Sequence, residues 1–120
     1  MTVSDLQRSI DFYSRLLGLT VRWRGTTPDG KPAAHVGDER LGGSYLALFQ
    51  TRTGSPARPT DDYDAVGLNH FGFIVPDLDE ARRCLVSMAI TPHLEADYEP
   101  GRRLYFHDLD GIEVELVQYD

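Results

Sequence analysis

The sequence has little that would mark a secreted, membrane-bound or nucleic-acid-binding protein. Cys84 is the only cysteine, which excludes an internal disulfide framework and fits a reducing compartment. No positively charged segment followed by an apolar one opens the chain as in a signal peptide. Twelve basic residues stand against nineteen acidic ones, and basic residues cluster only in pairs such as Arg102 and Arg103. We therefore expect a cytoplasmic protein that binds no nucleic acid and no membrane, and whose partner is a small molecule or another subunit.

The length and composition are typical of one small globular domain. A chain of 120 residues can bury about two thirds of its unfolded surface on folding. Its hydrophobic content of 41% is ordinary for a soluble fold, which excludes the disordered and membrane classes. We expect a single domain over residues 1–120.

The segment from Val66 to Leu78 is the most informative stretch. Its alternation predicts a strand with both faces largely covered, in which His70 shares a face with Leu68 and Ile74. Pro76 ends this strand, and the spacing of Asp77 and Glu80 predicts a helix over about residues 77–89. His70 is the one titratable, metal-competent side chain in the strand.

The first half of the chain gives a similar series of elements. Ser4 and Gln7 have the spacing of a helix cap, and an apolar stripe predicts a helix over about residues 5–17 that ends at Gly18. Strands are predicted over 20–24, 32–37 and 44–50, after the tail of a strand at 1–3. The polar stretch 51–65 is predicted to be a linker.

The pattern then repeats. The segment Val3 to Leu6 matches Val75 to Leu78 at an offset of 72 residues, and 43–50 matches 111–118 at an offset of 68. The second repeat supplies further strands over 91–96, 102–107 and 112–119. The predicted fold is therefore α+β, with two tandem βαβββ modules over about residues 1–52 and 66–120. The first strand of the first module is truncated.

Three segments carry a resemblance to a known family. VSDL with FY and LLGL near the start, NHFGFIVPDLDEA in the middle and YFHDLDGIEVELVQY at the end are similar to the vicinal oxygen chelate superfamily. This superfamily includes glyoxalase I, fosfomycin and bleomycin resistance proteins, methylmalonyl-CoA epimerase and extradiol dioxygenases. The resemblance implies curved sheets around a cleft, a homodimer, and a divalent metal held by the first and last strands of the modules.

The resemblance also implies which residues hold the metal. His70 matches the ligand position of the first strand in the second module, and Glu115 matches that of the last strand. Ala47 stands at the position of the first module that matches Glu115 and offers no ligand. The fourth position would fall before Met1. We therefore expect that the natural chain starts several residues upstream, with a His or Gln about five residues before Val3 as a third ligand.

The residue types alone allow a metal site without requiring one. Imidazole and carboxylate suit Zn, Ni, Mn or Fe(II), but a histidine bonded within the sheet and a solvated glutamate fit the same pattern. Glu113 shares a strand face with Glu115 and is predicted to face solvent, with a further ligand or base as the alternative. The remaining histidines are scattered along the chain and are predicted to be surface or packing residues, not ligands: His35, His93 and His107.

Alternation also indicates which side chains face a substrate. Arg103, Tyr105 and His107 share one face of their strand, opposite an apolar pair that should pack on a helix: Leu104 and Phe106. In the first module, Tyr45 and Phe49 flank Ala47 on the matching face, with Trp23 as a possible wall and aromatic core packing as the alternative.

Three functions fit these features. The first is a metal-dependent enzyme, namely a lyase, isomerase or dioxygenase. In it the metal binds the oxygens of a small carbonyl, hydroxy-acid or catechol-like substrate, and Glu115 is catalytic. The second is a metal-free binding protein of the bleomycin resistance type. The third is a member that retains only the fold and a dimer surface. The His70 and Glu115 pair favours the first function, and Ala47 favours the second.

Overall fold

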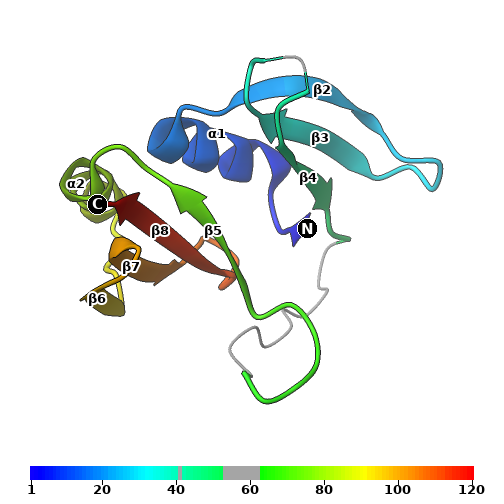
Figure 1. The fold of residues 1–120 in the computed structure, drawn as a ribbon. Coiled ribbons are helices and arrows are strands. Elements are labelled where there is room, and N and C mark those ends of the chain that lie inside the picture. Colours follow the sequence, from blue (N-terminus) through cyan, green and yellow to red (C-terminus); the bar gives the residue numbers. More distant parts are fainter. Residues whose placement is uncertain (41, 53–62) are drawn as a thin grey trace. The chain divides into compact units, whose positions relative to one another are not determined.

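The computed structural model describes residues 1–40, 42–52 and 63–120. The chain divides into two compact units, Met1–Pro56 and Ala57–Asp120. Unit 1 contains β1 (Thr2–Val3), α1 (Leu6–Leu17), β2 (Thr20–Thr26), β3 (Pro32–Gly37) and β4 (Tyr45–Gln50). Unit 2 contains β5 (His70–Ile74), α2 (Leu78–Ser87), β6 (Leu94–Tyr98), β7 (Gly101–His107) and β8 (Glu113–Tyr119). Each unit follows the order βαβββ, as predicted (Figure 1).

The two units have the same strand order. In unit 1 the order is β1-β4-β3-β2, and in unit 2 it is β5-β8-β7-β6. The first strand of each unit runs parallel to the last one, and the remaining pairs are antiparallel. The α+β class and the tandem modules are therefore confirmed. The first strand of unit 1 is short, with two residues against five in β5.

In each unit, one hydrogen bond of the same kind joins the start of the helix to the last strand. The side-chain oxygen of Gln50 accepts the backbone N–H of Leu6 at 3.0 Å. Gln118 does the same for Leu78 at 2.8 Å. Both pairs follow the sequence repeat, since Leu6 matches Leu78 and Gln50 matches Gln118. Each glutamine satisfies an N–H that has no partner within the helix.

The helices pack their apolar stripes on the sheets. In unit 1 the core contains Val3, Leu6, Ile10, Ala34, Val36 and Leu48. In unit 2, α2 packs on β7 and β8, and the predicted apolar pair of β7, Leu104 and Phe106, is buried. The opposite face of the unit 2 sheet is therefore available for polar side chains.

Two helix caps were predicted, and one of them is corrected. Asp77 caps α2 as expected, since its side chain accepts the N–H of Glu80 at 2.9 Å. The cap of α1 is Asp5, not Ser4, because Asp5 has the extended backbone of an N-cap and accepts the N–H of Arg8 at 3.0 Å. The repeat itself carried this signal, since Asp5 matches Asp77 at the offset of 72.

Some strand predictions also need correction. Leu68 lies outside β5, and Leu68 and Ile74 are 79% and 65% exposed, so the face that they were predicted to cover is open. The physical reason is that α2 packs on the opposite face of this sheet. The strand predicted over 91–96 is Leu94–Tyr98, because Pro92 has no N–H to donate to a neighbouring strand. The linker prediction falls largely on 53–62, outside the described residues.

Neither helix in the described ranges is long and apolar enough to cross a membrane.

Candidate metal centre

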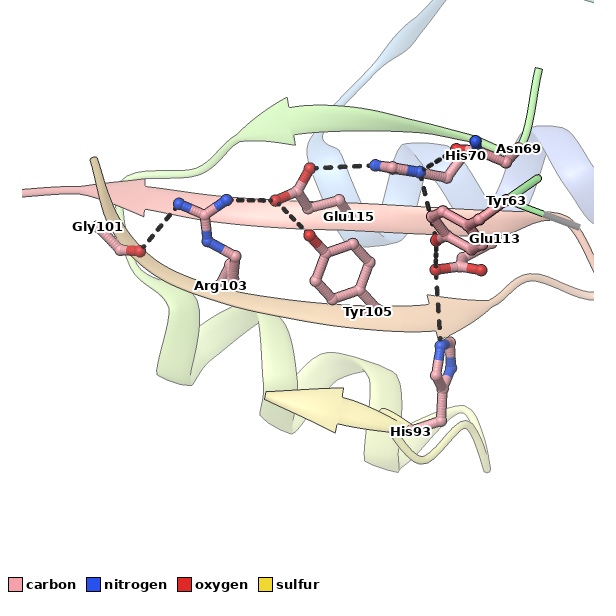
Figure 2. A network of polar contacts seen from close by, with 9 residues as sticks. All are labelled: Tyr63, Asn69, His70, His93, Gly101, Arg103, Tyr105, Glu113 and Glu115. Atoms are coloured by element: carbon pink, nitrogen blue, oxygen red, sulfur yellow. Dashed lines mark hydrogen bonds and ion pairs between the residues drawn. The ribbon is translucent and has the colours of Figure 1, made fainter. Parts of the chain in front are cut away.

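The polar face of the unit 2 sheet carries two carboxylates from one strand. Glu113 and Glu115 are two residues apart on β8, so their side chains point to the same face. Parallel pairing with β5 sets Glu113 opposite His70 and Glu115 opposite Gly72. Gly72 leaves room for the neighbouring carboxylate, since a Cβ atom there would lie 3.3 Å from Glu115 Oε2. The register of β5 and β8 thus brings an imidazole and two carboxylates together (Figure 2).

His70 and Glu115 approach each other through one atom each. His70 Nε2 lies 3.5 Å from Glu115 Oε2, and the two side chains are 25% and 14% exposed. This separation is longer than a strong hydrogen bond between the two groups. Two donors held by one tetrahedral ion at about 2.0–2.2 Å lie about 3.4 Å apart. The separation therefore fits a shared cation.

Neighbouring groups set the tautomer of His70. Its Nδ1 lies 2.6 Å from the side-chain oxygen of Asn69, which can only accept a hydrogen bond. The Tyr63 hydroxyl lies 3.4 Å from the same nitrogen and donates its own proton to Glu113. Nδ1 therefore carries the hydrogen of the neutral ring, which leaves the lone pair of Nε2 directed at Glu115. A histidine oriented in this way by a second group is typical of metal ligands.

Arg103 and Tyr105 hold the other oxygen of Glu115. Arg103 Nη1 donates to Glu115 Oε1 at 3.1 Å, and the Tyr105 hydroxyl donates to the same oxygen at 3.0 Å. Burial, followed by the hydrogen bond to Glu115, raises the pKa of the Tyr105 phenol above its ordinary value. The phenol therefore stays protonated at neutral pH and remains a donor. Oε2 is left to face His70 (Figure 2).

Arg103 is itself fixed by several contacts. Its Nη2 lies 3.1 Å from the carbonyl oxygen of Tyr98, 3.3 Å from that of Glu99 and 3.4 Å from that of Gly101. Its guanidinium carbon lies 3.8 Å from the centre of the Tyr98 ring. Arg103 and Tyr105 thus lie on the predicted face. Their expected contact with substrate stays a prediction.

Glu113 differs from its prediction as a solvent-facing acid. It is only 4% exposed, and it accepts a hydrogen bond from Tyr63. His93 Nε2 lies 3.8 Å from Glu113 Oε1, and the rings of His93 and His107 stack with centroids 4.4 Å apart. Both histidines are exposed, as predicted for surface or packing residues, but they also contact each other. No local sequence signal pairs them, because they meet only through the pairing of β6, β7 and β8.

Unit 1 presents an aromatic group on its own sheet. The register places Trp23 opposite His35 and His35 opposite Ala47. The His35 ring stacks on Tyr45 with centroids 4.2 Å apart and lies 5.0 Å from the ring of Trp23. Trp23 and Tyr45 are 44% and 50% exposed. The alternative interpretation, that Trp23 packs in the core, is therefore wrong. Phe49 is half-buried on β4, and the substrate roles of Tyr45 and Phe49 stay predictions.

A cavity of about 470 Å³ lies on the other side of unit 2, lined by α2, β6 and β7. Two ion pairs lie among its charged side chains, since Arg82 contacts Glu95 and Arg102 contacts Asp79. Arg103 also lines the cavity, but neither His70 nor Glu115 does. The cavity therefore does not contain the pair formed by His70 and Glu115.

Comparison with known proteins agrees with this fold. The model of the Glyoxalase/Bleomycin resistance protein/Dioxygenase superfamily matches residues 1–116. The chain belongs to this superfamily. The resemblance seen in the sequence is thereby confirmed.

Similar proteins cover almost the whole chain. The uncharacterized protein YaeR of Escherichia coli K12 is 31% identical over 120 residues, which cover 96% of this chain and 88% of YaeR. A glyoxalase family protein from Enterococcus faecalis is 27% identical, with a TM-score of 0.74 over 98% of this chain and 91% of that one. The fosfomycin resistance protein FosX of Listeria monocytogenes, in a mutant complexed with Mn(II) and 1S,2S-dihydroxypropylphosphonic acid, is 15% identical. Its TM-score is 0.72 over 100% of this chain and 88% of FosX, a likeness that shows the fold alone.

Proposed function

We propose that this protein is a metal-dependent enzyme of the glyoxalase and dioxygenase type. In this proposal His70 and Glu115 hold a divalent ion, which is Zn, Ni, Mn or Fe(II). A small substrate binds this ion through its oxygen atoms. The observation that carries it is the 3.5 Å approach of His70 Nε2 to Glu115 Oε2, between two atoms that both offer lone pairs. Without a shared proton or metal ion, these lone pairs would face each other unfavourably.

The donor set fits such an ion. A neutral imidazole and a carboxylate are ligands that borderline divalent metals accept. Asn69 fixes the His70 ring, and Arg103 with Tyr105 fixes Glu115, so both donors are oriented before an ion binds. The Mn(II) complex of the structurally similar FosX is consistent with this proposal.

The ion would supply Lewis-acid polarisation of a substrate oxygen. The other roles in the proposed reaction belong to residues of the chain. In this proposal Glu115 is both a metal ligand and the catalytic carboxylate, and Oε2, the oxygen that faces His70, is the atom through which it would act. Tyr105 and Arg103 keep Oε1 occupied and thereby hold Oε2 in place. The proposed substrate is a carbonyl, hydroxy-acid or catechol-like compound. The homodimer implied by the resemblance and the cytoplasmic location expected from the composition remain part of this proposal.

The test is metal analysis of protein purified without chelator and then dialysed against Zn²⁺ or Mn²⁺. His70→Ala and Glu115→Gln should each bind about one ion fewer per chain than the unchanged protein. His35→Ala and Glu80→Ala are matched controls on other faces and should bind as much as the unchanged protein. Catechol or a 2-hydroxy ketone should displace water from bound Mn²⁺ and lower the relaxation rate of water protons. Unchanged metal content in both site variants would refute the assignment.

A metal-free binding protein of the bleomycin resistance type is the second candidate function. The observations that favour it are Ala47 in place of a ligand and the exposed aromatic group of Trp23, His35 and Tyr45 in unit 1. A flat ligand could stack on these rings. If the protein binds no metal ion, flat aromatic compounds that quench Trp23 fluorescence would support this function. The Tyr45→Ala variant should lose this quenching.

A further inference from the structure

We infer that His93, His107 and Glu113 form a second divalent-metal site, separate from His70 and Glu115. One ligand atom from each of the three side chains lies within 4.8 Å of the others. The residues come from the segment before β6, the end of β7 and the start of β8. The site takes a borderline transition-metal ion such as Zn²⁺, because two imidazoles and one carboxylate are a donor set that zinc accepts.

The burial of Glu113 is the first argument. A carboxylate that is 4% exposed is costly unless a positive group lies beside it. Among the described residues, its ion-pair partner is His93, with no lysine or arginine. Glu115, two residues along the strand, has Arg103 instead. A bound cation would give Glu113 the positive charge that Arg103 gives Glu115.

The stacking of the two histidines is the second argument. Their rings are nearly parallel, with an angle of 18° and centroids 4.4 Å apart. The stack holds both imidazoles beside the buried Glu113 carboxylate, with one ligand atom of each residue within 4.8 Å of the others. Two imidazoles and one carboxylate from three separate segments are thus gathered at one place on the sheet.

The geometry allows an ion to enter and the ligands to close around it. His107 lies directly opposite Glu113 in the β7 and β8 register. His93 is anchored by its backbone N–H, which donates to the carbonyl of Tyr105 at 2.9 Å. Both histidines are exposed, so their rings can turn to shorten a 4.8 Å separation to the 3.4 Å or so of a tetrahedral site. Tyr63 donates to Glu113 and orients it, as a second group does in many metal sites.

Tyr63 also lies between the two sites. Its hydroxyl donates to Glu113 and lies 3.4 Å from His70 Nδ1. The two sites are therefore neighbours on one face but share no ligand. Figure 2 shows the continuous line of contacts from His93 through Glu113 and Tyr63 to His70 and Glu115.

The experiment uses the full chain with His70→Ala already introduced, so that only the second site remains. Equilibrium dialysis against Zn²⁺, followed by metal analysis, should find about one ion per chain. Adding His93→Ala or His107→Ala should weaken this binding at least tenfold, because loss of a supporting group alone costs about ten- to hundredfold. His35→Ala is the matched control and should leave it unchanged. Both ligand histidines are exposed, so these variants should fold, which far-UV circular dichroism checks.

Co²⁺ gives a second readout in the same proteins. The His70→Ala protein with bound Co²⁺ should show visible absorption bands of a low-coordinate site, and Glu113→Gln or His107→Ala should remove them. Zinc affinity unchanged by both His93→Ala and His107→Ala would overturn the inference. So would the absence of zinc from the His70→Ala protein. The proposed function fails by a different result, namely equal metal content in the unchanged protein and the His70→Ala variant.

Discussion

Replacing Arg103 by Met tests whether the polar face of unit 2 is held together as described. The guanidinium is 9% exposed, donates to Glu115 and bonds to the chain that leads into β7. Met has a similar length but no charge and no donor. The variant therefore leaves the Glu115 carboxylate, whose side chain is 14% exposed, without its positive partner.

The size of the effect follows from burial. Removing one partner of a buried ion pair typically costs about 3–5 kcal/mol. Tyr105 still donates one hydrogen bond to Glu115, so we expect the lower end, about 3 kcal/mol. With a urea dependence of about 1–3 kcal/mol per molar, the midpoint of unfolding should fall by about 1–3 M. That loss is a large part of the roughly 5–15 kcal/mol by which such proteins are stable.

The assay has to report on unit 2. Trp23, the only tryptophan, lies in unit 1, so fluorescence would follow the other unit. Hydrogen exchange of the β7 amides in urea reports on unit 2, and far-UV circular dichroism follows the unfolding of both units. Arg102→Met is the matched control, because Arg102 makes an exposed ion pair with Asp79, and exposed pairs contribute little to stability. Equal midpoints for the Arg102 and Arg103 variants would refute the reasoning.

Three further predictions follow from single contacts. Gly72→Ala places a methyl group 3.3 Å from Glu115 Oε2 and should lower divalent-ion affinity in dialysis while the circular dichroism spectrum stays unchanged. Asp5→Ala should cost about 1 kcal/mol in urea unfolding, and Ser4→Ala less; a larger cost at Ser4 would contradict the observed cap. Because the pKa of Tyr105 is raised in the folded state, its contribution to stability is complete below pH of about 10 and is lost as the pH rises through the folded pKa. Tyr105→Phe should therefore reduce the alkaline loss of stability, which urea midpoints across pH 8–11 measure.

The sequence by itself determined the elements and their repetition. Apolar periodicity of 3.6 and 2 residues marks helices and strands locally, so α1, α2 and most strands lie where they were predicted. The repeat predicted the tandem arrangement because each copy builds the same hydrogen bonds, as with Gln50 and Gln118. His70 and Glu115 were found from the resemblance, and alternation placed Arg103 and Tyr105 on one face.

Tertiary structure decided which polar side chains meet. Whether Glu113 is solvated or buried depends on the neighbours that β5 and β7 bring to it, and alternation along β8 holds no information about those neighbours. His93 and His107 are fourteen residues apart in sequence, and only the register of β6, β7 and β8 stacks them beside Glu113. The pairing of Arg103 with Glu115 has the same origin, since contacts across a sheet are set by strand register and not by spacing along the chain.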